Sequence, residues 1–395
     1  MNEDGKVTTS SWTISRCRDR LTRLAGSRQD ATSFRHETIA ELKRVVGFDG
    51  WCWASIDPLT GVTTTGLADN PAMIGTVRQM FELQYSTGDV NDYRDLARCN
   101  GVGRLFAATE GDPARSRRWT RLLGPSGIGD ELRAALAERG RCWGHLALYR
   151  SSDSPAFAAT HAGLFAPLLR GWAARQRREV QSRLSAAPVT GAVAGHAVLI
   201  LDASGTLVAQ SERAGRLLAA LPDRLGSGGP PLVVTALAAW LTVHTQQAAS
   251  APVPVCDSSG RWQIVQAHRL DGTLTPGSIA ITLTVAVPAQ LASLTMAAAG
   301  LTAREQDIAS LVLAGLTTAQ VAAAAHVAPC TVQDHLRGVF SKLAVADRHQ
   351  LTARLLYGPP DTADGATSSA HRLERLAESQ GPRTERRARL DRIVM

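Results

Sequence analysis

The sequence predicts a multidomain protein in which two α+β domains precede a small all-α domain of four helices. A chain of 395 residues is long enough for two to four domains, and its hydrophobic fraction of 44% is enough to build real cores. Stretches with the alternation of strands bracket helical stretches as far as about residue 290, while residues 301–356 carry four helix starts in succession. These observations separate a helical C-terminal domain from an α+β N-terminal part.

The region 1–185 is predicted to be the first α+β domain, with flanking helices. Apolar residues at helical spacing predict two helices over residues 12–47, a helical stretch around residues 73–85 and a long amphipathic helix over residues 157–184. Residues 50–66 predict two strands joined by a turn at Asp57-Pro58. Residues 125–150 predict a turn, then a helix or a strand, then a clear strand at residues 142–149.

The region 186–292 is predicted to be the second α+β domain, after a turn-rich linker at residues 185–195. Residues 196–221 predict a strand, a turn at Ser204-Gly205, a second strand and a helix, and residues 260–272 and 278–287 add two strands. Residues 226–231 are expected to be a loop, and the middle of the domain to be short on helix. Residues 288–300 are expected to be a linker into the four-helix domain, placed at 293–358. The tail, 359–395, is predicted to be disordered or weakly helical over 371–392.

The stretch 301–356 contains the start signals of four short helices. Short oxygen-bearing side chains cap helix N-termini, and a Glu or Gln three residues on completes a capping box. In chain order the signals are Thr302 with Glu305, Thr317 with Gln320, Pro329 in a first turn, and Asp347 with Gln350. Gly315 closes the first helix and opens a tight turn. Two helices joined by a short turn, the second with exposed polar groups near its N-terminus, form the arrangement that enters the DNA major groove.

This stretch resembles the DNA-binding domain of the LuxR/GerE family of transcription regulators. The matching segments are LTAREQDI, GLTTAQVA, TVQDHL and SKLAVADR, which stand in order at the right spacing. The resemblance implies that Pro329–Leu343 is the recognition helix, with Gln333, Asp334 and Arg337 facing base edges. Gln pairs bidentately with adenine, Asp accepts from cytosine and Arg pairs bidentately with guanine, at about 1–3 kcal/mol of discrimination for each pair.

The resemblance also implies a wider set of contacts and a core-facing stripe on the same helix. The further DNA-binding residues are Thr317, Thr318, Thr331, His335 and Lys342, the last three toward phosphates. Val332, Leu336 and Phe340 are expected to face the core of the domain. The fourth helix is where the family usually dimerises, and core packing accounts equally well for its leucines at positions 351, 355 and 356.

The chain departs from the family pattern in ways that weaken DNA binding. It has Gln333 where the family usually has Lys, Thr318 where it usually has Asn, and Ala328 where a Ser usually caps the recognition helix, a loss of about 1 kcal/mol. Residues 301–356 carry five basic and four acidic side chains, a net charge of +1. Because phosphate contacts supply most nonspecific affinity, we expect weak binding by the isolated domain and reliance on dimerisation. The alternative is that these polar residues form only a solvated helix face.

Local similarities extend to the two α+β regions. The strings GIGDELRAAL and RCWGHLALYR resemble the GAF-like N-terminal region of actinobacterial LuxR-type regulators. The string VLILDASGTLV, followed by a helix, resembles the start of a PAS domain, here a divergent one. These resemblances imply a GAF-like and then a PAS-like domain, which serve in sensing or in dimerisation and relay.

Several kinds of catalytic and metal site are missing from the sequence. There is no G-x-x-x-x-G-K-[ST] phosphate loop and no H-E-x-x-H, and GPSGIG at 124–129 matches neither a dinucleotide fingerprint nor a nucleophile elbow. The six cysteines never stand in CxxC spacing, which argues against zinc and against a disulfide scaffold. We therefore expect no enzyme, no catalytic residues, no metal and no cofactor.

A few isolated residues allow two interpretations each. Trp51, Trp53 and Trp143 are candidate ligand-binding residues, although aromatic packing on core strands explains them equally well. His145 on an apolar strand is a possible haem ligand, but a core histidine is the favoured interpretation. Cys52 is a possible redox sensor or chromophore anchor, but ordinary strand packing is favoured.

The composition points to a nucleic-acid partner and away from a membrane. The net charge is +8, and most basic residues lie outside residues 301–356. They cluster at 16–23, 115–121, 170–183 and 383–392, and most of these clusters are interpreted as solvated helix faces. No run of 18 apolar residues and no secretory signal occurs, so a cytoplasmic location is expected.

Together these features predict a cytoplasmic transcription regulator that binds double-stranded DNA at an inverted-repeat operator as a homodimer. A signal bound in a sensor domain, such as an unknown small molecule, would shift how two helix-turn-helix units are presented to the operator. Two alternatives remain. One is a partner-binding regulatory protein whose helix-turn-helix no longer binds DNA tightly, and the other is an enzyme with an appended DNA-binding domain.

Overall fold

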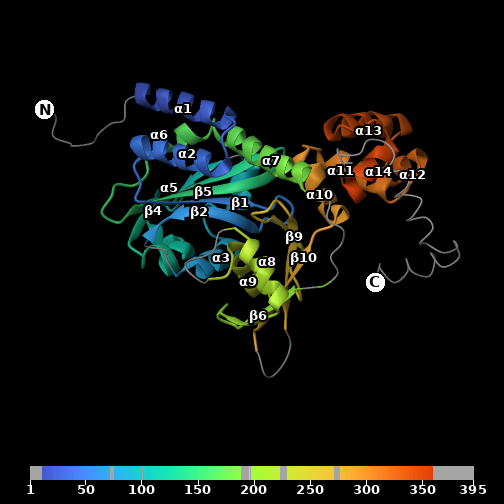
Figure 1. Cartoon of the computed structure of the whole chain (residues 1–395). Coiled ribbons are helices and arrows are strands. Elements are labelled where there is room, and N and C mark those ends of the chain that lie inside the picture. Colours follow the sequence, from blue (N-terminus) through green and yellow to red (C-terminus); the bar gives the residue numbers. More distant parts are fainter. Residues whose placement is uncertain are drawn as a thin grey trace.

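The computed structural model describes residues 11–71, 75–99, 101–187, 195, 197–222, 229–270 and 276–358. Two antiparallel five-stranded sheets, each with its own helices, are followed by a C-terminal helical domain (Figure 1). The predicted fold class, two α+β regions and then an all-α domain, is confirmed. Within these residues, no helix has both the length and the apolar character needed to cross a membrane.

The first sheet has the strand order β2-β1-β5-β4-β3. The strands are β1 (Gly50–Ile56), β2 (Thr63–Asp69), β3 (Val102–Arg104), β4 (Ile128–Glu138) and β5 (Arg141–Ser151). The segment expected to be a helix or a strand is β4, which pairs with β5 in a long hairpin. The hairpin turns at Arg139 and Gly140, whose φ angles of 54° and 75° match the turn type that fits the twist of paired strands.

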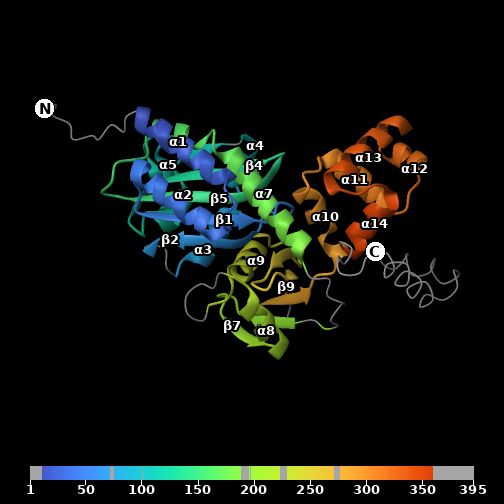
Figure 2. The same ribbon diagram turned by 45° about the horizontal axis from the view of Figure 1, so that its top comes forward.

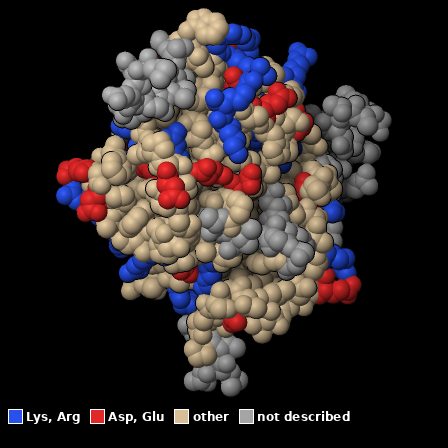
Figure 3. Space-filling model, turned by 90° about the vertical axis from the view of Figure 1, so that its left-hand side faces the viewer, with Lys and Arg blue, Asp and Glu red and all other residues tan. Residues whose placement is uncertain are grey.

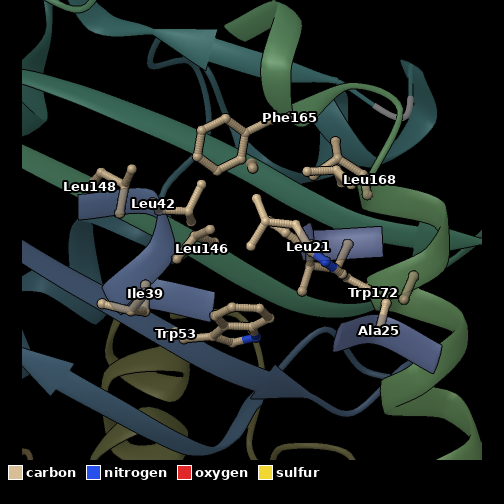
Figure 4. Close-up of a cluster of buried hydrophobic side chains, with 14 of the residues drawn as sticks. Leu21, Ala25, Ile39, Leu42, Trp53, Leu146, Leu148, Phe165, Leu168 and Trp172 are labelled. Atoms are coloured by element: carbon tan, nitrogen blue, oxygen red, sulfur yellow. The ribbon is translucent and has the colours of Figure 1, made fainter. Parts of the chain in front are cut away.

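One face of this sheet is covered by α1 (Ser11–Gly26), α2 (Ala31–Val46), α6 (Ala159–Phe165) and α7 (Leu169–Ala186) (Figure 1). Their apolar side chains form a core with residues of β1, β4 and β5, where Trp53 packs against Trp172 (Figure 4). The ring of Phe34 also contacts Trp53, edge to face. The prediction of one helix over residues 157–184 was wrong, because a break at residues 166–168 separates α6 from α7. Pro167 lies in that break, and proline removes a backbone donor and clashes with the preceding turn.

The other face carries short helices and a buried charge network. The elements are α3 (Val77–Tyr85), α4 (Tyr93–Cys99), α5 (Leu105–Ala108), a short 3-10 turn η2 (Pro113–Arg115) and a π-helical turn η3 (Trp119–Leu123). The buried Arg118 guanidinium lies 2.8 Å from the carboxylate of Glu131, which also accepts from Arg133 at 3.0 Å. Arg118 belongs to a cluster expected to be solvated, so for this residue that interpretation was wrong.

His145 and Cys52 lie on this same face of the sheet. The ring of His145 stacks on Tyr93 with 3.7 Å between ring centroids. Burial, helped by Arg133, lowers the pKa of His145 to about 3, so the imidazole is neutral at physiological pH. Burial raises the pKa of Cys52 to about 11, which keeps its thiol protonated and unreactive. Both residues thus have the surroundings of core side chains.

The second sheet repeats the strand order of the first, as β7-β6-β10-β9-β8. Its strands are β6 (Ala197–Leu201), β7 (Leu207–Gln210), β8 (Val253–Cys256), β9 (Trp262–Arg269) and β10 (Ile279–Val285), and its helices are α8 (Glu212–Ala220) and α9 (Leu232–Val243). The strand–turn–strand–helix order predicted for residues 196–221 is present among the described residues. Residues 188–194 of the predicted linker, residues 226–228 of the predicted loop and the tail from 359 lie outside the described residues, while residues 185 and 186 of that linker belong to α7.

The expectation that the middle of this region is short on helix was wrong, because α9 fills it. Its sequence, LVVTALAAWLTV, is apolar on every side and carries no amphipathic period. One side of α9 packs on β9, and the other packs on α3 and β2 of the first sheet (Figure 2). The helix is therefore shared by the two sheet domains, which explains why it has no polar stripe.

The C-terminal domain contains α11 (Ala303–Leu313), α12 (Thr318–Ala324), α13 (Pro329–Leu343) and α14 (Arg348–Tyr357). All four predicted helices are present. Thr302 and Thr317 form the predicted capping boxes, and the Asp347 carboxylate accepts from the Gln350 amide at 2.8 Å. Gly315 follows α11 with φ +86°, as its predicted role as a helix stop requires.

The expected linker at residues 288–300 is instead a helix, α10 (Pro288–Ala298), that lies where all three domains meet (Figure 2). Ala297 and Ala298 belong to the core of the first sheet, and Leu291 and Leu294 pack with Trp262 of the second. Ala292 and Met296 belong to the core of the C-terminal domain. Because each side of α10 faces a different core, the three domains are joined through one helix.

Candidate nucleic-acid interface

The candidate recognition helix, α13, begins and ends at the predicted residues. Val332, Leu336, Val339 and Leu343 form its buried stripe, and Phe340 packs against the same core while partly exposed. Ala328 occupies the N-cap position with no side-chain hydrogen bond, and Pro329 follows in the first turn. The predicted loss of a cap is therefore confirmed, and the first amides of α13 lack the partner that a Ser would supply.

The three predicted base-reading residues lie together on the outer side of α13. Gln333, Asp334 and Arg337 are all exposed. The Arg337 guanidinium donates to the Asp334 carboxylate one helical turn away, and these side chains are 74% and 67% exposed. An exposed pair at this spacing contributes only about 0.3–0.5 kcal/mol, so Arg337 can exchange Asp334 for another acceptor at little cost.

Five other predicted DNA contacts surround this group. Thr317 is the N-cap of α12, where its hydroxyl accepts from the Gln320 amide at 3.3 Å, and Thr318 is the first residue of that helix. Thr331 and His335 lie half-buried on α13, and so does Lys342 near its C-terminal end. The eight predicted residues thus lie on α12 and α13.

Lys342 is already held by a carboxylate of its own domain. Its Nζ lies 2.6 Å from Oε2 of Glu305 on α11, and the same oxygen accepts from the amide of Thr302 at 2.7 Å. Burial alone would raise the pKa of Glu305, but the bonds from Lys342 and Thr302 outweigh it and hold the pKa below its usual value. Lys342 therefore stabilises the contact between α11 and α13 in addition to its predicted role at a phosphate.

Two further arginines of the domain also serve its own fold. Arg304 donates to the carbonyl of Ala325 at the end of α12, and Arg348 donates to the carbonyl of Leu316 in the turn before α12. Together with the Lys342 and Arg337 pairs, these bonds engage most of the positive charge of the domain. The small positive charge of this domain is therefore less available to phosphates than its count suggests.

The inner side of the domain is docked against the first sheet by three arginines that the sequence did not reveal as a group. Arg139 at the β4–β5 turn donates to the carbonyl of Gly300 at 2.7 Å, and Arg141 donates to Oε1 of Gln306 at 2.5 Å. Arg177 of α7 donates to the carbonyl of Ala298 at 2.6 Å and to Glu138 at 2.8 Å. A two-residue Arg-Gly connection between strands was the available signal for this turn.

The fourth helix also faces inward. Leu351 and Leu355 are buried in the core of the C-terminal domain, Leu356 is half-buried, and α14 packs mainly against α10. Core packing therefore accounts for the first two leucines.

The three candidate ligand-binding tryptophans have different surroundings. Trp51 and Trp53 are buried among the helices that cover the first sheet. Trp143 belongs to the same core but also lines a cavity between the two sheet domains. The structure thus separates Trp143 from the other two.

Charge on the far end of the molecule is mixed. Figure 3 looks at the end opposite the C-terminal domain, where Lys and Arg side chains gather near the top with Asp and Glu beside and below them. An end with both signs interspersed offers no single-sign surface of the kind that follows a phosphate backbone.

Comparisons with known proteins agree with this arrangement at the C-terminus. Residues 299–355 match the family model for bacterial regulatory proteins of the luxR family. No curated protein matches the chain.

Among solved structures, similarity is distant. Escherichia coli SdiA matches at 12% identity and TM-score 0.32, over 87% of this chain and 98% of that chain. The GAF domain of a phosphoenolpyruvate-protein phosphotransferase from Coxiella burnetii matches at 14% identity and TM-score 0.29, over 42% of this chain and 94% of that chain. Similarity at this level assigns no ligand or partner to this chain. The C-terminal match and the geometry above agree: residues 299–355 form a helix-turn-helix domain of the LuxR family of bacterial regulatory proteins.

Proposed function

We propose that this protein is a sequence-specific DNA-binding transcription regulator that acts as a homodimer on an inverted-repeat operator. The observation that carries the proposal is the exposed group Gln333, Asp334 and Arg337 on α13 of a LuxR-family domain. These side chains match the donor and acceptor patterns that distinguish base pairs in the major groove. The proposal assigns the chain no catalysis and no cofactor.

In this proposal the remaining contacts position the domain on the DNA backbone. Thr317 and Thr318 at the start of α12, and Thr331, His335 and Lys342 on α13, would contact phosphates. Phosphate contacts fix the register of the domain but carry no sequence information directly. Because most cations of the domain already have internal partners, two domains on one operator are needed for tight binding.

The N-terminal regions are proposed to modulate this binding. We assign residues 1–185 to a GAF-like domain, 186–292 to a divergent PAS-like domain and 293–358 to the DNA-binding domain. Support comes from α10, which packs in all three cores, and from the arginines that dock the C-terminal domain. Domains joined through packed cores move as one, so a shift in either sheet domain would change how α13 is presented to the operator.

The proposal is tested by DNA selection followed by affinity measurement. A genomic fragment library would supply a target, and fluorescence anisotropy of the full chain would then compare target with random DNA at two salt concentrations. Arg337→Ala should weaken binding to the target by about 1–3 kcal/mol and relax specificity at one base. Arg216→Ala is a matched control, because Arg216 forms a similarly exposed one-turn ion pair with Glu212 on α8. Equal losses on target and random DNA would refute base reading by Arg337.

A second candidate function is that of a partner-binding regulator whose helix-turn-helix has weakened. The specific observations in its favour are the uncapped α13 and the internal pairing of Lys342, Arg304 and Arg348. Salt separates the two candidates, because each phosphate contact releases a counterion and true DNA binding weakens steeply as salt rises. A flat salt response with micromolar or weaker affinity would favour the second candidate.

A further inference from the structure

A cavity of about 60 Å³ lies at the contact between the two sheet domains. The first domain contributes the end of β1, the following turn, β2, β5 and α7, and the second contributes β8 and β9. Leu294 of α10 closes part of the wall, next to the apolar side chains of Ile56, Val180, Val255 and Trp262, and polar side chains such as Ser55, Thr64 and Thr65 line the rest. The cavity thus touches the same helix that carries the DNA-binding domain.

Three residues of this wall carry polar atoms with no hydrogen-bond partner in the described part of the chain. They are Nε1 of Trp143, Oε1 of Gln176 and Oδ1 of Asp57. The residues are 2%, 4% and 3% exposed, respectively. A buried polar atom without a partner costs about 1–3 kcal/mol, so three at one cavity indicate that something else completes them.

The side chains that carry these atoms are held in place by their neighbours. The amide of Gln176 lies directly over Gly144, where an added Cβ would stand only 2.2 Å from Oε1. Only glycine leaves room for that amide. The other oxygen of Asp57 accepts from the amide and hydroxyl of Thr60 at 3.0 and 2.5 Å, which leaves Oδ1 as the free one. Burial raises the pKa of Asp57, and the Thr60 bonds and Arg141 oppose this rise only in part.

We propose that this cavity binds a small, uncharged molecule that carries an N–H or O–H donor and a carbonyl-type acceptor. The indole N–H of Trp143 would donate to the acceptor of the ligand, and Oε1 of Gln176 and Oδ1 of Asp57 would accept from its donors. The apolar part of the wall suits the small hydrocarbon part of an amide or a hydroxyketone. An anionic ligand fits poorly, because the wall contains the Asp57 carboxyl and Arg183 already pairs with Glu179 at 2.8 Å. Burial disfavours the charged form of Asp57, which weakens this carboxyl as a partner for a cation.

Two connections lead from the cavity to the DNA-binding domain. The first is Leu294, which lines the cavity and belongs to α10. The second is Arg141, which donates to the carbonyl of Pro58 in the cavity wall at 3.4 Å and also to Oε1 of Gln306 on α11. A ligand in the cavity would therefore shift the positions of α10 and α11 relative to the two sheet domains. This regulatory role rests on the proposed function, whereas the binding site itself does not.

The test uses the full-length protein with ¹⁵N-labelled tryptophan and observes indole N–H signals by NMR. Acetamide is the probe, and acetone, nearly the same size but without an N–H donor, is its matched control. Trp143→Phe identifies the signal of Trp143. Trp172→Phe identifies the reference signal, because Trp172 is equally buried in the same core, has an unpartnered Nε1 and does not line the cavity.

We expect acetamide to shift the Trp143 signal saturably while the Trp172 signal stays in place. Affinity for acetone should be about tenfold lower, the value of one good hydrogen bond. Gln176→Met, which removes an acceptor at similar volume, should weaken acetamide binding by a similar factor. Equal affinity for the two probes, parallel shifts of all tryptophan signals or no saturable shift would overturn the site, and the wild-type titrations decide this even if a variant fails to fold.

The outcomes also separate this inference from the proposed function. Saturable binding in a chain that binds no selected DNA would support the site and count against the regulator. Tight DNA binding by a chain whose Trp143 signal never responds would do the reverse.

Discussion

The outer and inner sides of the C-terminal domain differ sharply in how they are held. On the outer side, Gln333, Asp334 and Arg337 are exposed and interact at most with one another. On the inner side, α10 packs in three cores, and three arginines of the first domain donate to residues 298–306. The surface that would read DNA is open while the position of the domain is fixed.

This difference indicates where control would act. A domain that covers its recognition helix is controlled by uncovering it, but α13 is already accessible here. Control through this arrangement would instead change the orientation of α13 relative to a second copy, because two half-sites accept only one spacing. Substitutions on the two sides should therefore differ in their effects on stability and on DNA binding.

The largest effect is expected from a core substitution on the inner side. Leu355 is almost fully buried between α14 and its neighbours, so Leu355→Ala should lower the free energy of unfolding by about 2–5 kcal/mol. Gln333→Ala on the outer side is the control and should change it by less than about 0.5 kcal/mol. Urea unfolding measures both. Similar losses in the two variants would contradict the division into an inner and an outer side.

The arginine contacts are expected to be next in size. Arg177→Ala removes charged bonds to the Ala298 carbonyl and to Glu138, and should cost about 2 kcal/mol. Hydrogen exchange should also quicken at residues 297–301, where the C-terminal domain joins the first sheet. Arg178→Ala, an exposed neighbour on the same helix, should leave both readouts unchanged. Unchanged exchange in Arg177→Ala would mean that the docking does not depend on this contact.

Glu305 on α11 accepts a hydrogen bond from Lys342 on α13, and this bond should make the free energy of unfolding depend on pH by about 1 kcal/mol. Its pKa is lowered in the folded protein, so its contribution is present above the ordinary pKa of Glu and is lost as pH falls through the lowered value. Glu305→Gln should therefore destabilise the domain at pH 7 and reduce its acid sensitivity. Thermal unfolding between pH 7 and pH 3 measures this. A variant as acid-sensitive as the wild type would argue against the Lys342 bond as the cause.

The smallest expected effect is a gain. Ala328 has the extended backbone of an N-cap but no capping side chain, so Ala328→Ser should stabilise α13 by about 0.5–1 kcal/mol. Thermal unfolding of the variant would rise slightly. A lower midpoint would show that another group already satisfies the first amides of the helix.

The sequence was most informative where signals are local. The limits of α13, the capping boxes at Thr302 and Thr317 and the stop at Gly315 depend on residues within a few positions of each other, and all are found. The Glu305–Lys342 bond joins residues 37 positions apart, and no spacing rule indicates such a pair. DNA contact by the eight predicted residues stays a prediction.

The missed helices share one physical cause. Both α9 and α10 are apolar on nearly every side, because each is enclosed by more than one domain. Periodicity detects a helix only when one side meets water, so these two had no polar stripe to mark them. The same enclosure makes α10 the connection between the domains. The docking arginines at 139 and 141 were missed for a different reason: they lie in the β4–β5 hairpin, and the sequence did not decide whether its first half is a helix or a strand.

The most direct test of the central claim is anisotropy of the full chain on a selected operator, with Arg337→Ala and Arg177→Ala measured beside it. An accessible α13 on a fixed domain predicts salt-dependent binding by the wild type and a loss of about 1–3 kcal/mol for Arg337→Ala on target DNA alone. For Arg177→Ala, the expected result is a change in affinity for the full operator and no change for a single half-site. Equal changes for both would mean that the orientation of α13 is unimportant. Two results would contradict the claim: wild-type binding that does not weaken as salt rises, or binding that neither substitution changes.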